Sequence, residues 1–269
     1  MFERCFIFPG LKSLGYESGM SMPCPVTRAR QIDLQISRYH EGEVAAQARL
    51  EIPQDCLQFR TWQSNWNCDL MACGPLDIFV ARIVARGTDE EPPGLGELEA
   101  QMLFRHSSGW TSSLLTGFVP FRPAAYKFAS IIHTGHYFPD RRAYSSSTIF
   151  TNVRSPADGL EAGRFSVTVQ SRDGTQLGQI ERQIVANSAL VVALDDVLHE
   201  CGVGKATAQE GFNLTFIGGR SQFSIMTVFQ RRDNGAIGLE HSLAPLYYIP
   251  QLRDAAVRST VYGRMGSKA

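Results

Sequence analysis

The chain has 269 residues, of which 43% are hydrophobic and 19% are charged. This composition argues against a wholly disordered chain, because enough apolar surface is available to offset the entropy of ordering the chain. The 26 basic residues equal the 26 acidic residues, so no long-range field favours nucleic acid or an anionic membrane, and we expect no nucleic-acid partner.

The length corresponds to about two domains. The apolar run near the N-terminus is too short for a signal peptide, and no stretch reaches the ~20 apolar residues that cross a bilayer. The six cysteines are spaced irregularly, unlike a dense disulfide framework. We therefore expect a cytoplasmic protein with reduced thiols and no transmembrane segment. Peripheral association with a membrane complex is compatible with this expectation.

The first half of the chain predicts strands joined by turns. Residues 32–36 alternate between apolar and polar, which is typical of a half-buried strand. Glu41-Gly42 can form a turn, after which 44–52 can return as a second strand. Later strands are expected over 78–84 and 98–104.

The second half shows the same pattern more clearly. Apolar residues at 165, 167 and 169 alternate with polar ones, and Asp173-Gly174 suits a tight hairpin because glycine accepts positive φ. An Asn-Gly turn signal follows at Asn234-Gly235. The remaining strands of this half are expected over 177–185, 212–217, 223–229 and 237–239.

Helix is scarce in this pattern. Only 193–199 and a tail at 250–262 are expected to be helical, whereas many strands separated by turn signals favour a sandwich or a barrel. Two prolines, Pro120 and Pro123, interrupt strand pairing near the middle of the chain. We therefore predict an all-β fold of two tandem antiparallel β-sandwich domains, over 1–125 and 126–269, with the C-terminal tail on the second domain.

The hydrophobic patterns of the two halves also match each other. At one constant offset, three apolar residues of the first half fall on three of the second: Ile32, Leu34 and Ile36 on Phe165, Val167 and Val169. Phe104 corresponds in the same order to Phe229. A diverged internal duplication explains the match, and similar alternation in two unrelated β domains is the alternative.

No catalytic motif is complete in this sequence. The segment Gly202-Val203-Gly204-Lys205 lacks the earlier glycine and the following hydroxyl residue of a phosphate-binding loop. His199 and Cys201 lie close in sequence, but sequence proximity does not create the oriented pair that nucleophilic catalysis needs. We therefore expect a non-catalytic protein without a cofactor.

Two histidines in one short segment suggest an alternative function. His133 and His136 can converge on one metal ion, and His241 can supply a third ligand. Structural or surface histidines are the competing interpretation. A metal-dependent enzyme that uses these three residues is accordingly one alternative.

A group of aromatic residues suggests another alternative. Phe59, Trp62 and Trp66 can line a groove for a small ligand or a carbohydrate, because aromatic faces provide large contact area. Aromatic residues of a β domain also fill the core. This group therefore predicts either a ligand-binding module or part of the interior.

Aromatic residues near the two ends of the chain suggest a surface for another protein, since aromatic residues are enriched at interfaces. The candidate partner-binding residues are Phe2, Phe6, Phe8, Tyr247, Tyr248 and Tyr262. The leading hypothesis is a non-catalytic interaction, scaffold or accessory subunit of a larger protein assembly, whose partners are other protein subunits.

Overall fold

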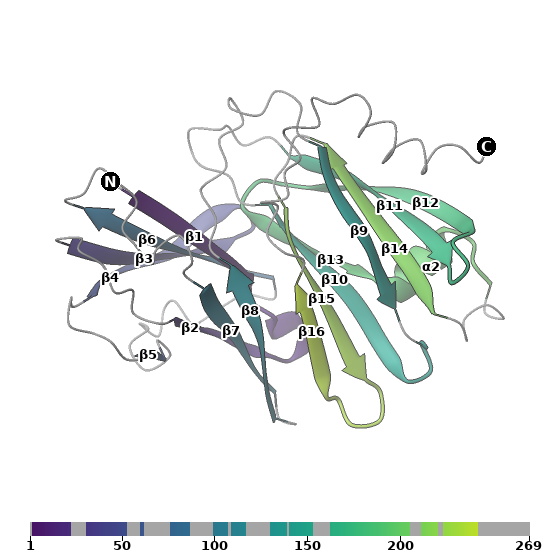
Figure 1. The fold of residues 1–269 in the computed structure, drawn as a ribbon, viewed down its shortest axis with the longest axis horizontal. Coiled ribbons are helices and arrows are strands. Elements are labelled where there is room, and N and C mark those ends of the chain that lie inside the picture. Colours follow the sequence, from purple (N-terminus) through teal and green to yellow (C-terminus); the bar gives the residue numbers. More distant parts are fainter. Residues whose placement is uncertain are drawn as a thin grey trace.

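The computed structural model describes residues 2–22, 31–52, 60–61, 76–86, 99–106, 109–116, 130–138, 140–152, 162–204, 211–219 and 223–241. These residues form two groups of antiparallel sheets that lie next to each other along the long axis of the molecule (Figure 1). Strands β1 to β8 build the N-terminal half, and β9 to β16 build the C-terminal half.

The N-terminal half has two four-stranded sheets. The first has the order β1-β6-β3-β4 and the second the order β5-β2-β7-β8. A short 3-10 helix, η1 (Lys12–Leu14), connects the first two strands. The strands are β1 (Phe2–Pro9), β2 (Glu17–Met22), β3 (Gln31–His40), β4 (Glu43–Ile52), β5 (Arg60–Thr61), β6 (Ile78–Arg86), β7 (Glu99–His106) and β8 (Gly109–Thr116).

The C-terminal half also has two four-stranded sheets, with the orders β12-β11-β14-β9 and β13-β10-β15-β16. Helix α2 (Leu194–Glu200) directly follows β13. The strands are β9 (Ser130–Phe138), β10 (Tyr144–Asn152), β11 (Gly163–Ser171), β12 (Gln176–Ile184), β13 (Ser188–Ala193), β14 (Phe212–Gly219), β15 (Phe223–Arg231) and β16 (Ile237–His241).

The two halves have the same strand order. When β9 to β16 are counted as first to eighth, both halves pair the fourth, third, sixth and first strands in one sheet and the fifth, second, seventh and eighth in the other. All the pairings are antiparallel. The all-β prediction of antiparallel sheets is confirmed. A shared strand order is what an internal duplication would leave, and the duplication itself remains a prediction.

The hairpins form where the sequence placed turn signals. Glu41 and Gly42 both have positive φ, 49° and 92°, as a two-residue hairpin turn requires, and they join β3 to β4. Gly174 at φ 89° joins β11 to β12. In both hairpins the ladder shifts register once, and such irregularities blunt the exposed edge of a sheet.

Each half has its own apolar interior. In the C-terminal half the ring of Phe150 stacks on Phe165 with 4.2 Å between centroids and meets Phe216 edge-on at 4.9 Å. In the N-terminal half Phe8 stacks on Phe79 with 5.0 Å between centroids. The alternating residues that predicted the strands supply much of this interior, because every second side chain of a strand points to the same face.

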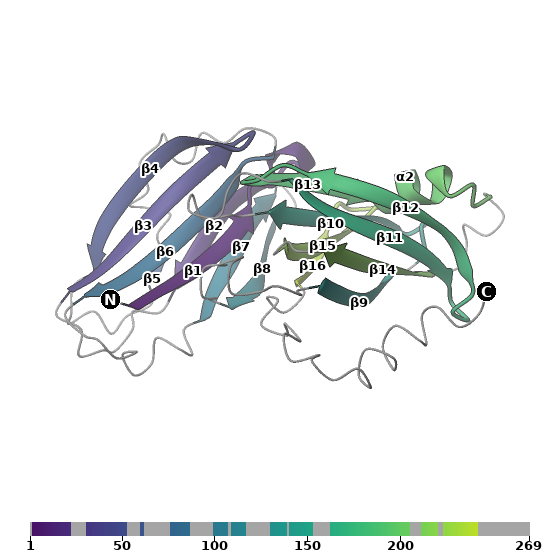
Figure 2. The same cartoon turned by 90° about the horizontal axis from the view of Figure 1, so that it is seen from above.

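The two halves also pack against each other. Strand β8 contacts β16, and both views place the two strands side by side (Figures 1 and 2). Strand β10 contacts β1, and the adjacent residues Ile149 and Phe150 of β10 are both fully buried. Because neighbouring strand residues point to opposite faces, both faces of β10 are covered.

Several elements were absent from the sequence prediction. Strands β1, β2, β8, β9, β10 and β13 carry weaker alternation, and they were found only in the structure. The helix expected over 193–199 is present as α2. The tail expected at 250–262 and the boundary expected at 125/126 lie outside the described residues. Among the helices that the structure describes, none has the length and apolar character to cross a membrane.

Candidate functional site at the junction of the two halves

A buried carboxylate marks the end of the first sheet that faces the C-terminal half. Asp77 directly precedes β6, and its carbonyl accepts a hydrogen bond of 2.6 Å from the N–H of Gly10, just after β1. Its side chain has no exposed surface. Arg38 Nη1 lies 2.8 Å from Asp77 Oδ2, and His40 Nδ1 lies 2.6 Å from Oδ1. The C-terminal end of β3 is therefore fixed to the start of β6 by charge-assisted contacts.

The imidazole of His40 is oriented by this contact. An ionised carboxylate only accepts hydrogen bonds, so Nδ1 acts as the donor and Nε2 is the nitrogen left for solvent or a partner. The His40 side chain is 48% exposed. The buried Asp77 therefore holds an exposed imidazole in one direction at the surface.

The hairpin turn after His40 reaches the C-terminal half. A methyl group at Gly42 would lie 3.0 Å from the carbonyl oxygen of Ala186, which belongs to the turn between β12 and β13. That turn is itself fixed: the N–H of Asn187 donates to the Asn152 carbonyl at 2.6 Å. The Asn152 amide also donates to the carbonyls of Ile184 and Val185 at 3.2 and 3.3 Å. Two rigid turns from different halves thus meet at one point.

Two aliphatic side chains are exposed beside this contact. Val44 is 48% exposed and Val185 is 54% exposed. Among the residues whose burial the structure describes, they are the exposed large hydrophobic residues. Each lies within two residues of Gly42 or Ala186. We call the exposed residues that lie within two positions of Gly42 or Ala186 in the sequence the junction patch; they are His40, Glu41, Glu43, Val44 and Val185.

A second link between the halves involves a buried tyrosine. The hydroxyl of Tyr16 donates to the Gly235 carbonyl at 3.4 Å and accepts from Gln230 Nε2 at 3.3 Å. Tyr16 follows η1, whereas Gln230 and Gly235 belong to the β15–β16 hairpin region. Burial raises the pKa of the Tyr16 phenol above 10.0, and the Gln230 hydrogen bond partly opposes this shift. Tyr16 therefore holds this hairpin against the N-terminal half.

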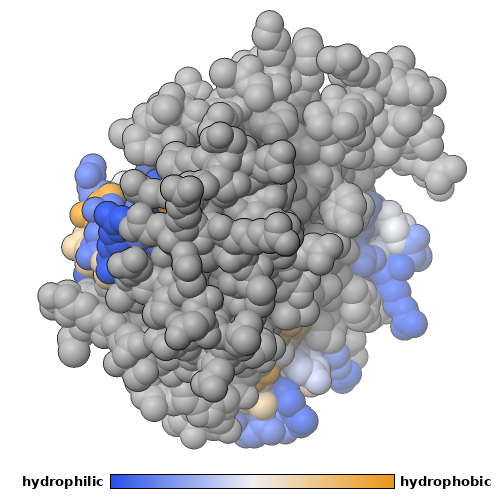
Figure 3. All heavy atoms as spheres, turned by 60° about the vertical axis from the view of Figure 1, so that its left-hand side comes forward, coloured by the Kyte–Doolittle hydropathy of each residue, from blue (hydrophilic) through white to orange (hydrophobic). Residues whose placement is uncertain are grey.

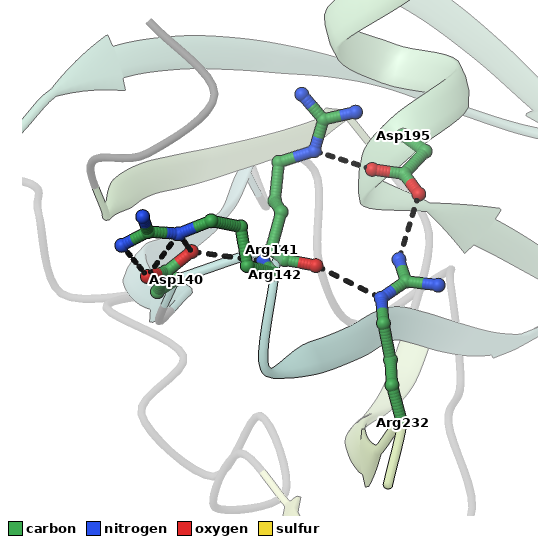
Figure 4. Close-up of polar contacts among 5 residues, drawn as sticks. All are labelled: Asp140, Arg141, Arg142, Asp195 and Arg232. Carbon is green, nitrogen blue, oxygen red and sulfur yellow. Dashed lines mark hydrogen bonds and ion pairs between the residues drawn. The ribbon is translucent and has the colours of Figure 1, made fainter.

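An ion-pair group also holds this hairpin region (Figure 4). Arg141 Nε lies 2.5 Å and Arg232 Nη2 lies 3.2 Å from the carboxylate of Asp195 in α2. Arg232 Nε also donates to the Arg141 carbonyl at 2.8 Å. These contacts connect the β9–β10 turn, α2 and the β15–β16 hairpin. The acid neutralises much of the local positive charge, so we assign this group a structural role.

Asp140 and Arg142 form a separate exposed pair in the same turn (Figure 4). The side-chain hydrogen bond from Arg142 lowers the pKa of the Asp140 carboxyl. The same bond raises the pKa of the Arg142 guanidinium. Exposed pairs of this kind add little stability, so we expect this pair to fix the turn only locally.

The free thiol of Cys201 is not activated. Burial raises its pKa, and the negative charge of Glu200 raises it further, although Arg182 opposes the shift. Cys201 packs against β12 so closely that a Cβ at Gly178 would lie 2.6 Å from its Cβ. The thiolate form that nucleophilic chemistry requires is therefore disfavoured. The contact indicates that Cys201 fills space beside Gly178.

The structure places the three candidate metal ligands in two sheets. His133 and His136 pair with Phe216 and Leu214, and the register shift between these two pairs lets the histidines oppose residues two positions apart on β14. His241 pairs with Met226 in the other sheet of the same half. Within the part of the chain that the structure describes, no group of three or more His, Cys, Asp and Glu side chains could hold a metal ion. The metal alternative remains a prediction.

The candidate partner-binding aromatics are only partly within the described residues. Phe6 and Phe8 lie on β1 and are fully buried in the N-terminal half. As core side chains they offer no surface to a partner, which corrects the expectation for these two residues. Phe2 begins β1 and pairs with Ala85. Tyr247, Tyr248 and Tyr262, like the proposed ligand-binding residues Phe59, Trp62 and Trp66, lie outside the described residues.

The junction patch was missed by sequence reasoning. The turn at Glu41-Gly42 was expected, and its positive φ values agree with that expectation. Nothing in the pattern indicated that this turn meets Ala186, more than a hundred residues later. The available signal was Val44, shortly after the predicted turn. This signal was insufficient, because single exposed apolar residues are common on protein surfaces.

No protein-family model matches the sequence, and no curated protein matches it. Solved structures give weak similarity. A β-glucuronidase from Bacteroides uniformis is 10% identical, with a TM-score of 0.18, over 89% of this chain and 26% of that chain. A glycosyl hydrolase family 2 member from Bacteroides cellulosilyticus is 8% identical, with a TM-score of 0.16, over 88% of this chain and 27% of that chain. The chain thus spans about a quarter of the length of these proteins, and similarity at these TM-scores supports no argument about function.

Proposed function

We propose that this chain is a non-catalytic interaction or accessory subunit that binds another protein through the junction patch. The observation that supports the proposal is the exposure of Val44 and Val185, which lie within two residues of Gly42 and Ala186, where the two halves meet. Covering each valine would contribute about 1 kcal/mol or more, because burying apolar surface is worth ~25 cal/mol per Å².

Val44 and Val185 are exceptional among the large hydrophobic residues whose burial the structure describes, since the others are buried or partly buried. On the face drawn in Figure 3, the visible described residues are mainly hydrophilic, and the apolar ones form small separate areas. The backbone around the junction patch is held by Asp77 on one side and by Asn152 on the other. A partner would therefore meet a preorganised surface, which reduces the entropy cost of binding.

The patch also depends on both halves. Val44 belongs to β4 and Val185 follows β12, so neither half carries both valines. A partner that needs both side chains would recognise only the assembled chain. This dependence suits a subunit whose role is to present one composite surface within a larger assembly.

Site-specific photo-crosslinking tests the proposal. A benzoylphenylalanine residue is placed at Val44, at Val185 or, as a control, at Thr175 in the exposed β11–β12 turn. In cells that naturally contain the chain, we expect the two junction positions to crosslink to the same protein and the control position to give no such product. The absence of a shared product from Val44 and Val185, or an equal yield of it from Thr175, would contradict the proposal.

A further inference from the structure

We infer that Asn234 is a site of spontaneous modification, at which the side-chain amide closes onto the following backbone nitrogen and yields isoaspartate. Asn234 is exposed in the turn between β15 and β16, and Gly235 follows it. The reaction needs the nitrogen of the next residue to approach the side-chain carbonyl carbon, and glycine allows this approach because it has no Cβ. The turn thus carries both reacting groups in consecutive residues at the surface.

The reaction is balanced with water as the co-reactant. The nitrogen of Gly235 attacks Cγ of Asn234, so a new N–C bond forms and the bond from Cγ to Nδ2 breaks. The leaving nitrogen takes up the proton of the Gly235 amide and departs as ammonia. Water then opens the resulting ring at either carbonyl, and the product is aspartate or isoaspartate.

The folded turn holds the side chain of Asn234 over the attacking residue. The N–H of Ala236 donates to Asn234 Oδ1 at 2.9 Å, so the side-chain carbonyl arches across the Gly235 peptide. This donor also stabilises the negative charge that develops on Oδ1 during the attack, as a donor of an oxyanion hole does. The same hydrogen bond therefore both positions and polarises the amide.

One contact opposes the reaction. The N–H of Gly235 donates to the Arg231 carbonyl at 2.9 Å, and this bond must open before the nitrogen can attack. A single hydrogen bond in an exposed turn slows the step by about tenfold or less, because its net contribution to stability is small. The missing side chain of Gly235 and the donor on Asn234 act in the opposite direction, so the site stays reactive in the folded chain.

The other asparagines that the structure describes are protected. Asn152 and Asn187 are buried, and Asn213 lies within β14, where strands on both sides hold its backbone. None of the three precedes a glycine. Among the described asparagines, modification is therefore expected at Asn234.

A second hairpin provides a matched comparison. Asp173 precedes Gly174 in the exposed turn between β11 and β12. Its Oδ1 accepts from the N–H of Thr175 at 3.1 Å, so the side chain makes the same kind of hydrogen bond as that of Asn234. The hydrogen bond from the Ser171 hydroxyl lowers the pKa of the Asp173 carboxyl. The ionised carboxylate is a poor electrophile at neutral pH, so isoaspartate should form about tenfold more slowly at Asp173 than at Asn234.

The product changes a link between the two halves. Isoaspartate adds a methylene to the main chain directly before Gly235, whose carbonyl accepts the Tyr16 hydroxyl at 3.4 Å. The added carbon displaces this carbonyl from Tyr16. Modification of Asn234 therefore loosens the contact of the β15–β16 hairpin with the N-terminal half.

Ageing of the full chain tests the site. The native chain, Asn234→Asp and Asp173→Asn are kept at neutral pH and body temperature for several weeks, after circular dichroism has confirmed that each is folded. Peptide mass spectrometry locates the deamidated residues, and enzymatic methylation of isoaspartate measures the product. We expect deamidation at Asn234 in the native chain, its loss in Asn234→Asp, and a second site in Asp173→Asn, which places an asparagine in the matched hairpin.

Three results would overturn the assignment. They are no more isoaspartate at Asn234 than at Asp173 in the native chain, deamidation at a buried asparagine as fast as at Asn234, and no deamidation at position 173 of Asp173→Asn.

Melting curves test the effect on the link between the halves. The native chain and Tyr16→Phe are each compared before and after ageing. We expect ageing to lower the melting temperature of the native chain more than that of Tyr16→Phe, because the variant has already lost the hydrogen bond to the Gly235 carbonyl. An equal loss in the two proteins would contradict the loosening of this contact.

Discussion

Among the residues whose burial the structure describes, the N-terminal half buries two carboxylates, whereas the buried polar residues of the C-terminal half are neutral. Asp33 and Asp77 are both buried and are paired with Arg49, Arg38 and His40. In the C-terminal half the hydroxyls of Thr148 and Thr227 lie 3.3 Å apart on neighbouring strands. The strand order therefore does not depend on whether the buried polar contacts are charged or neutral. The free energy of unfolding that is lost when one contact is removed does depend on it.

The aromatic interiors differ as well. The C-terminal half builds its core around a three-ring group of Phe150, Phe165 and Phe216. The described part of the N-terminal half has the stacked pair of Phe8 and Phe79. The comparison indicates that apolar volume, rather than particular partners, is what the common strand order requires.

The largest effect is expected from emptying either core. Phe150→Ala should lower the free energy of unfolding by about 4 kcal/mol, because it removes transfer energy and leaves a cavity. Phe8→Ala is the matched change in the other half. Since β8 contacts β16 and β10 contacts β1, we expect both variants to unfold in one transition in urea. Two transitions, with each variant shifting a different one, would mean that the halves are energetically independent.

The next effect concerns the buried charge that distinguishes the N-terminal half. Asp77→Ala should cost about 3 kcal/mol, because it leaves the largely buried Arg38 guanidinium without its carboxylate. Asp140→Ala removes an acid from an exposed pair and serves as the control, with little change expected. Urea unfolding at neutral pH measures both. If Asp77→Ala lost no more unfolding free energy than Asp140→Ala, the buried ion pair would not stabilise the N-terminal half, and the proposed difference between the halves would be wrong.

Two hairpin glycines allow the contact between the halves to be measured. Gly42 and Gly174 have nearly the same positive φ, 92° and 89°, so alanine should strain either turn by about 1 kcal/mol. A methyl group at Gly174 meets nothing within 4 Å, whereas one at Gly42 meets the Ala186 carbonyl at 3.0 Å. Gly42→Ala should therefore cost about 1 kcal/mol more in thermal or urea unfolding. An equal loss of unfolding free energy in Gly42→Ala and Gly174→Ala would show that the contact between the halves adjusts to the added methyl group at no energetic cost.

The smallest effect is expected at the tyrosine that links the halves. Tyr16→Phe should cost about 1 kcal/mol, because it removes the hydrogen bonds with Gln230 and the Gly235 carbonyl. Because the pKa of Tyr16 is raised in the folded state, its contribution is complete below pH 10.0 and is lost as the pH rises through the folded pKa.

Unfolding measured from pH 8 to pH 11 tests this dependence on Tyr16. The native chain should lose more stability above pH 10 than Tyr16→Phe loses. Parallel curves for the two proteins would mean that Tyr16 ionises as freely in the folded state as in the unfolded one.

Much of the fold was predictable because its signals are local. The alternation around Val167 and the turns at Gly42, Gly174 and Gly235 depend on residues within a few positions of each other, and the corresponding strands and hairpins are present. Strand β10 escaped prediction because Ser145 to Thr148 is a run of hydroxyl residues. Such a run neither alternates between apolar and polar residues nor forms the continuous apolar run that is typical of a strand covered on both faces.

The candidate site could not be predicted in the same way. Val44 and Val185 both lie close to the contact between Gly42 and Ala186 only because two turns from different halves meet there. Phe6 and Phe8 became core residues because β1 pairs with β6, some seventy residues later. Pairings at such separations depend on the packing of the whole chain and leave no signal within a short window.

The period of two, the positions of the turns and the scarcity of helix follow from the order of the residues, because backbone preference and side-chain alternation act over neighbouring positions. The strand order within each sheet, the burial of Asp77 beside His40 and the exposure of the two valines near the junction depend on the folded chain as a whole. Those features arise from contacts between distant segments, where packing and desolvation of the assembled chain determine which side chains remain at the surface.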